Sequence, residues 1–188
     1  MRLILLLLLP VLCARAQDMP QLRDGESRDH KYDCWLLRED KKLRLCVVQR
    51  EPRKVLVEIP SALEALIGKN DLAPDLARKT RAYWSPNSAY VVMREPDNSD
   101  TQSTVILVGV EPDAAKRIPI DMEKLRGLSP KKHTDWSVEF GDWVGKRMFV
   151  LQLHGMTFNP AGQNEHDEIS ILCQITKDGE LKMINADE

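Results

Sequence analysis

The residues best suited to chemistry lie in the last third of the chain, where two histidines flank an acidic run. His154 ends one predicted strand, and His166 and Asp167 precede the next. Imidazole nitrogens and carboxylate oxygens are the donors that zinc and other transition metals take in proteins. Neighbouring antiparallel strands would bring the imidazoles together, so the pattern predicts a metal site of His154, His166 and Asp167. Simple solvation of a charged loop is the alternative.

A second group of candidate residues is aromatic. Trp136 and Trp143 flank Phe140 in a segment that is predicted to be a loop. Aromatic side chains exposed on a loop are typical anchors for a partner, so Trp136, Phe140 and Trp143 are candidate partner-binding residues for an unknown protein or glycan. The alternative is that they pack over the end of a sheet. The other two tryptophans, Trp35 and Trp84, lie beside predicted strands and fit a core better.

Motifs for other kinds of chemistry are absent from the sequence. There is no Gly-x-Ser-x-Gly run of an α/β hydrolase, no glycine-rich phosphate loop and no Cys-x-x-Cys pair. The sequence therefore assigns no catalytic residue and no cofactor.

The elements that must position these residues follow an export signal. Residues 1–16 have a short positive start, an apolar core and small residues before a cut after Ala16, which predicts a cleavable signal peptide and a secreted or periplasmic protein. The apolar core is shorter than the roughly 20 residues of a transmembrane helix, so no membrane span is expected after cleavage. An uncleaved anchor and a lipoprotein signal at Cys13 are the alternatives. Residues 17–29 are predicted to be a flexible segment and residues 30–188 a single β-rich domain.

Charge excludes some partners. The chain carries a net charge of −2 with both signs interspersed, which gives no electrostatic reason to bind nucleic acid or anionic lipid. One local basic cluster is interpreted as a solvated loop; it consists of Lys124, Arg126, Lys131, Lys132 and His133.

The cysteines predict a disulfide in an oxidising compartment. Residues 32–38 and 43–49 read as a hairpin in which Trp35 faces Leu45 and Cys34 faces Cys46. We therefore predict a Cys34–Cys46 disulfide. Cys173 lies on the apolar face of a later strand and is predicted to be a buried, unreactive thiol.

Alternation and turn residues predict the other elements. Further strands are expected at residues 54–59, 90–94, 104–110, 116–120, 147–153, 168–176 and 181–184. The unbroken apolar run at residues 105–108 indicates a central strand covered on both faces. Short helices are expected after Ser61, at residues 71–79 and after Asp121. The predicted fold is mainly β, with antiparallel meanders and one to three short helices.

One stretch carries a family resemblance. The sequence Tyr-Trp-Ser-Pro-Asn-Ser at residues 83–88, followed by an apolar strand, resembles the turn of TolB-like and prolyl-oligopeptidase-type β-propeller blades. Asn87 and Ser88 stand where that family usually has Asp-Gly. The resemblance implies blade-like sheets, in an incomplete propeller or an open sheet, and implies no catalytic residues.

These observations favour an exported, non-enzymatic binding or accessory module. The alternative is a metal-assisted hydrolase that uses a His154/His166 site. A structural role without a discrete site also remains open.

Overall fold

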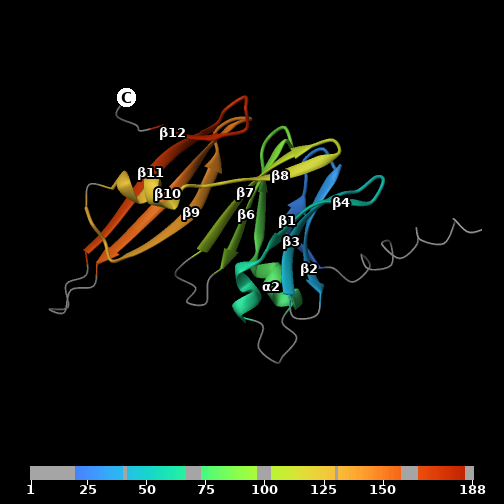
Figure 1. Ribbon diagram of the computed structural model, residues 1–188, viewed down its shortest axis with the longest axis horizontal. Coiled ribbons are helices and arrows are strands. Elements are labelled where there is room, and N and C mark those ends of the chain that lie inside the picture. Colours follow the sequence, from blue (N-terminus) through green and yellow to red (C-terminus); the bar gives the residue numbers. More distant parts are fainter. Residues whose placement is uncertain are drawn as a thin grey trace, which may run out of the picture.

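The computed structural model describes residues 20–39, 42–66, 73–96, 103–129, 131–157 and 165–184, so the predicted signal peptide lies outside the described residues. The described chain is mainly β, as predicted, with two short α-helices and one 3-10 helix (Figure 1). Two antiparallel-rich sheets contain all of its strands. No described helix is long and apolar enough to cross a membrane.

The larger sheet has eight strands in the order β4-β3-β2-β1-β5-β6-β7-β8. Its strands are β1 (Gln21–Glu26), β2 (Tyr32–Glu39), β3 (Lys42–Gln49), β4 (Lys54–Pro60), β5 (Arg81–Trp84), β6 (Tyr90–Pro96), β7 (Ser103–Glu111) and β8 (Ala114–Ile118). All neighbours are antiparallel except β1 and β5, which run parallel and join the two halves. The sheet curls into a nearly closed barrel, and no ladder joins β4 to β8 in the described residues. The 3-10 helix η1 (Ala62–Leu66) and α2 (Ala73–Lys79) lie at one end, and hairpin turns lie at the other (Figure 1).

The smaller sheet is a four-stranded meander in the order β12-β11-β10-β9. It consists of β9 (Asp135–Trp143), β10 (Met148–Thr157), β11 (Glu165–Ile175) and β12 (Leu181–Ile184), and α3 (Met122–Gly127) connects it to the barrel. The turn before β12 places Gly179 at a φ of 79°, a left-handed conformation that glycine adopts without strain.

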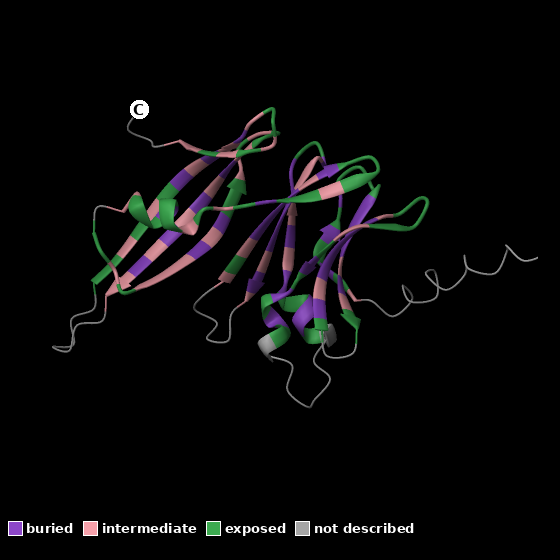
Figure 2. Cartoon of the chain, viewed as in Figure 1, coloured by how far each residue is buried: buried purple, intermediate pink, exposed green. Residues whose placement is uncertain are grey.

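Two hydrophobic cores result from the alternation of side chains along β6 and β7. Val91 and Met93 face the barrel interior, whereas Val92 faces the second sheet. On β7, Val108 faces the barrel interior and Leu107 faces the second sheet. None of these five residues has exposed surface. Figure 2 shows the resulting bands of buried residues along the strands of both sheets. The predicted central strand is therefore confirmed, and burial on both faces holds the two sheets together.

The predicted register of the first hairpin is wrong by one residue. Cys34 pairs with Val47, and Cys46 pairs with Trp35. A slip of one residue moves side chains to the opposite face of a sheet, so Cys34 faces the barrel core while Cys46 does not. Both thiols are free and buried, which contradicts the predicted Cys34–Cys46 disulfide. Trp35 correspondingly lies outside the barrel core, half-buried beneath the guanidinium of Arg53.

Three segments that were not predicted to be strands belong to the sheets, namely β1, β5 and β9. β1 lies within residues 17–29, which were predicted to be flexible, and its Leu22 is 3% exposed in the barrel core. β9 replaces the predicted loop that contains Phe140. Each segment has few apolar residues in alternation, because only part of its length faces a core.

The predicted helix starts after Ser61 and Asp121 are confirmed, the first with a change of partner, whereas the predicted start at residue 71 lies outside the described residues. Asp121 caps α3 by accepting from the Lys124 amide at 3.0 Å. Ser61 precedes η1, but the buried carboxylate of Glu95, not Glu64, binds this end by accepting from the Ala62 amide at 3.0 Å. Ser61 Oγ also donates to Glu95, which fixes η1 against β6.

Candidate functional site

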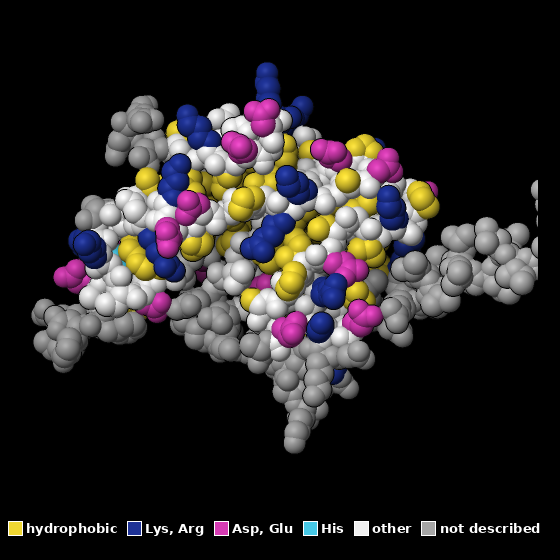
Figure 3. Space-filling view, in the orientation of Figure 1, with side chains coloured by type: hydrophobic (Ala, Val, Ile, Leu, Met, Phe, Trp, Pro, Cys, Tyr) yellow, Lys and Arg dark blue, Asp and Glu magenta, His cyan; other side chains and the backbone are white. Residues whose placement is uncertain are grey.

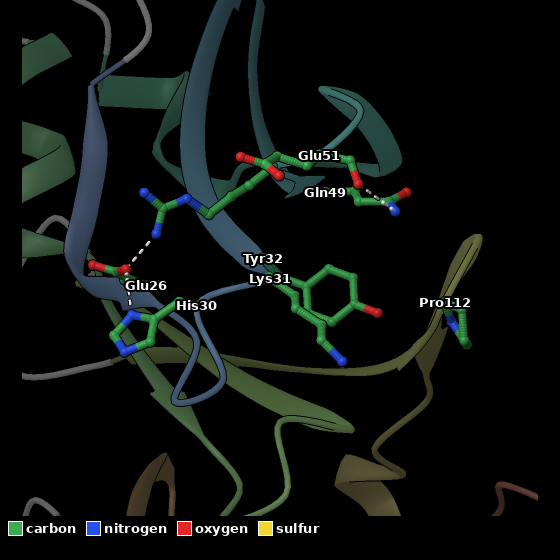
Figure 4. A pocket seen from close by; sticks show the side chains of 8 residues that line it. Glu26, His30, Lys31, Tyr32, Gln49, Glu51 and Pro112 are labelled. Atoms are coloured by element: carbon green, nitrogen blue, oxygen red, sulfur yellow. Dashed lines mark hydrogen bonds and ion pairs between the residues drawn. The ribbon is translucent and has the colours of Figure 1, made fainter.

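A polar cleft opens at the hairpin end of the barrel (Figure 4). It encloses about 670 Å³, against 230 and 190 Å³ for two other hollows of the described chain. The turns after β1, β3 and β7 contribute its walls, which consist of Glu26, His30, Lys31, Tyr32, Gln49, Arg50, Glu51 and Pro112. A volume of about 300–1,000 Å³ is typical of small-molecule sites, and barrel mouths are frequent places for them.

Tyr32 supplies an aromatic wall that the barrel core holds in place. Its ring stacks on Trp84 with centroids 6.2 Å apart, and only 8% of the residue is exposed. The indole of Trp84 donates to the Gly25 carbonyl at 2.9 Å, so the pair is tied to β1. Burial, with the charges of Asp29 and Asp113, raises the pKa of Tyr32, so its hydroxyl stays protonated and can donate. In Figure 4 this hydroxyl points toward the side of the cleft where Pro112 lies.

A chain of ion pairs forms the opposite wall. Glu26 faces His30 Nδ1 at 2.7 Å and also accepts from Arg50 (Figure 4). These two hydrogen bonds lower the pKa of Glu26. Arg50 lies 3.6 Å from Asp33, whose carboxylate accepts from Gln21 at 2.8 Å. Burial raises the pKa of Asp33 despite the nearby guanidinium.

The turn between β1 and β2 carries two basic residues of the cleft, His30 and Lys31. Ser27 Oγ accepts from the amides of Tyr32 and Lys31, at 2.9 and 3.2 Å. The Asp29 amide donates to Ser88 Oγ at 3.2 Å, which ties this turn to the turn between β5 and β6. His30 has a φ of 59°, a conformation that costs free energy in a residue with a Cβ. The surrounding hydrogen bonds therefore fix where His30 enters the cleft.

These groups are suited to binding. Lys31, Arg50, Gln49 and the Tyr32 hydroxyl donate hydrogen bonds, and Glu26 and Glu51 accept them. His30 is paired with Glu26 and with no hydroxyl or thiol nucleophile among the described cleft residues. The cationic and anionic side chains nearly balance, so the cleft fits a polar ligand of low net charge.

The predicted metal ligands do not form one site. The imidazoles of His154 and His166 lie on one face of the four-stranded sheet with ring centroids 6.3 Å apart, as the adjacent strands imply. Asp167 projects from the other face, because it follows His166 directly in β11. It accepts instead from His133 at 2.9 Å and from Lys131 at 3.1 Å. The described residues contain no group of three His, Cys, Asp or Glu side chains that could hold a metal ion.

The candidate partner anchors lie in β9 and pack toward the barrel. Phe140 is 6% exposed and contacts Tyr83 at a centroid distance of 4.6 Å. Trp143 is half-buried, and its indole donates to the Tyr83 carbonyl at 2.9 Å. Trp136 is also half-buried, beside the ring of His133. These aromatic residues therefore pack between the two sheets from within a strand, which differs from the predicted exposed loop and from the alternative of packing over the end of a sheet.

Sequence reasoning also misplaced one histidine. His133, assigned to a solvated basic loop, has a side chain with no exposed surface. Its Nδ1 lies 2.9 Å from Thr157 Oγ1, and its Nε2 lies 2.9 Å from Asp167 Oδ2. The ring packs directly on Gly155, where a Cβ would lie 2.3 Å from His133 Cδ2. The glycine in an otherwise regular strand was the available signal, since such a residue marks a close approach.

The comparisons with known proteins give no further guide. No known protein family matches the sequence, and neither a curated protein nor a solved structure is significantly similar to it. The resemblance of residues 83–92 to propeller repeats therefore rests on the sequence of that turn. The function must be inferred from the chemistry of the cleft.

Proposed function

We propose that this chain is an exported, non-enzymatic binding module whose polar cleft holds a saccharide. The observation that carries the proposal is the cleft of about 670 Å³, in which three hairpins place alternating donors and acceptors around Tyr32. A saccharide presents hydroxyl groups that both donate and accept hydrogen bonds, and the lining side chains supply both acceptors and donors for them. Near balance of the charges favours such a neutral ligand over a nucleotide or a polyanion.

Export fits this proposal, because the signal-like residues 1–16 would deliver the cleft to a compartment where glycans occur. The walls are also held before any ligand arrives. The Trp84 ring stacks on Tyr32, and Ser88 Oγ accepts a hydrogen bond from the turn that carries Lys31. A preformed site loses less conformational entropy on binding, which favours affinity for a small ligand.

The test is binding of the purified chain to an immobilised panel of mono- to tetrasaccharides, followed by NMR titration with the saccharides retained. We expect resonance changes at Lys31, Tyr32 and Glu51. Tyr32→Phe removes only the hydroxyl, so it should weaken binding by about tenfold, the equivalent of one hydrogen bond. Lys146→Ala is the control, since this exposed residue lies in the turn before β10, outside the cleft lining.

Two results would refute the proposal. One is that no saccharide of the panel binds at millimolar concentration. The other is saccharide binding that Tyr32→Phe and Glu51→Ala leave unchanged, which would place the ligand elsewhere on the chain.

A further inference from the structure

Two of the chain's four histidines have rings without a polar partner. His30 and His133 each face a carboxylate, at 2.7 and 2.9 Å. The rings of His154 and His166 contact each other, but neither makes a hydrogen bond or an ion pair with another described residue. His166 is exposed and His154 is half-buried, so solvent reaches both. Each neutral ring therefore has a nitrogen lone pair available to a ligand.

The strand pairing places a methionine beside these two rings. β10 and β11 are antiparallel neighbours, and Met156 lies directly opposite His166 in their ladder. Because side chains alternate along a strand, Met156 also shares the face of His154, whereas Thr157 turns to His133 on the other face. Opposed Cβ atoms in such a ladder lie about 4.5–5.5 Å apart, so the flexible thioether of Met156 can reach the ring of His166.

The separation of the two rings suits one shared ion. A metal bound about 2.0 Å from a ring nitrogen lies roughly 3.2 Å from the centroid of that ring, so two rings on one ion have centroids at most about 6.4 Å apart. The observed centroid distance is 6.3 Å, which corresponds to a nearly linear arrangement of nitrogen, metal and nitrogen. Tetrahedral zinc would need the two centroids at roughly 5.2 Å. The spacing therefore favours an ion that accepts two nearly opposed nitrogens.

The third donor selects a soft ion. Thioether sulfur binds soft metals such as Cu(I), whereas carboxylate and carbonyl oxygens suit Mg, Ca and Mn. Glu168 lies opposite His154 in the ladder, but in the described chain it does not complete a group of three His, Cys, Asp or Glu ligands. Figure 3 shows acidic and basic side chains interspersed on the face drawn, without a broad acidic patch among the described residues, so charge alone would not concentrate cations on that face.

We propose that His154, Met156 and His166 form a site for Cu(I) on the face of the four-stranded sheet that is turned away from the barrel. The two imidazoles of the metal site predicted from the sequence are kept, and a thioether takes the place of Asp167. No residue of this site lines the polar cleft, so the proposal does not depend on saccharide binding.

The test is NMR titration of the purified chain with Ag(I), an air-stable ion with the charge and donor preference of Cu(I), and in parallel with Zn(II). We expect one Ag(I) per chain to shift the methyl resonance of Met156 and the ring resonances of His154 and His166. Zn(II) should bind at least about tenfold more weakly, since a thioether is not among its usual donors.

A methionine variant tests the third donor. Met156→Leu keeps the size of the side chain and removes the sulfur, so it should weaken Ag(I) binding at least about tenfold. Met148→Leu is the matched control, because Met148 lies at the other end of β10 on the same face and is also half-buried. This control should leave Ag(I) binding unchanged.

A double variant, His154→Gln with His166→Gln, separates the proposed site from the thiols, which also bind Ag(I). The free thiols of Cys34, Cys46 and Cys173 are buried and remain in this variant, so it should lose Ag(I) binding while it stays folded. The proposal is overturned if Ag(I) leaves the three resonances unchanged, if Met156→Leu and Met148→Leu weaken binding equally, if the double variant still binds Ag(I), or if Zn(II) binds as tightly as Ag(I).

Discussion

Replacing Gly155 with alanine should destabilise the fold through His133. An alanine Cβ at this position would lie 2.3 Å from His133 Cδ2 and 2.8 Å from Trp136 Cζ3, closer than any real contact. The buried imidazole must then move, which breaks its hydrogen bonds to Thr157 and Asp167. Overpacking at a close contact costs about 1–3 kcal/mol, and the lost hydrogen bond to Thr157 adds about 1 kcal/mol, so the expected loss is about 2–4 kcal/mol. That is a large part of the roughly 5–15 kcal/mol by which a domain is stable.

Urea unfolding followed by tryptophan fluorescence measures this loss. Gly145→Ala is the control, because nothing lies within 4 Å of a Cβ there, and it should change stability by less than about 0.5 kcal/mol. In a His133→Ala background, Gly155→Ala should cost much less, since the main clash has been removed. The reasoning fails if Gly155→Ala unfolds at the wild-type urea midpoint, or if its cost is the same in both backgrounds.

Three further predictions concern charge and thiols. Burial raises the pKa of Glu95 in the folded state, so the stability that this group contributes is fully present below its unfolded pKa of about 4.3 and is lost as pH rises through the higher folded pKa. Glu95→Gln should reduce this fall in urea titrations run from about pH 4 upwards. The hydrogen bond from His133 lowers the pKa of Asp167, so its stabilisation is present above the unfolded value and lost as pH falls below about 4. Asp167→Asn should flatten that acid limb, and an unchanged limb would disprove the assignment. Cys34, Cys46 and Cys173 are fully buried, so a thiol reagent should react with them only after denaturation, whereas a Cys34–Cys46 peptide in a non-reducing digest would contradict the observed register.

Local patterns were sufficient for the elements that face one core along their whole length. In β11, Ile171, Cys173 and Ile175 alternate on one face, and the structure buries all three against the barrel. Cys173 is accordingly buried as predicted, and burial raises its pKa to about 12. Asp121 indicated the start of α3 for an equally local reason, since a capping side chain reaches an amide only a few residues away.

The register of the first hairpin was beyond local reasoning. Four consecutive residues of β2, from Cys34 to Leu37, are apolar, so either alternate set could face the core. The choice depends on which set meets Leu22 of β1 and the other barrel strands. The predicted disulfide failed for this reason, because its geometry depended on the parity of the register.

The cleft was not visible in the sequence either. Tyr32 and Lys31 come from one turn, Gln49 and Glu51 from another and Pro112 from a third. None of these residues belongs to a motif, and their types are those of ordinary surface turns. Only the curling of the eight-stranded sheet into a nearly closed barrel brings the three turns around one hollow.

The sequence by itself determined the class of fold, most strand positions, the helix starts after Ser61 and Asp121 and the burial of Cys173, because alternation and capping act over a few residues. The tertiary structure alone decided the hairpin register, the separation of Asp167 from His154 and His166, the burial of His133 and the assembly of the cleft. Each of these depends on strands that are distant in the chain and meet in space, where excluded volume and hydrogen-bond geometry choose between arrangements that are locally equivalent.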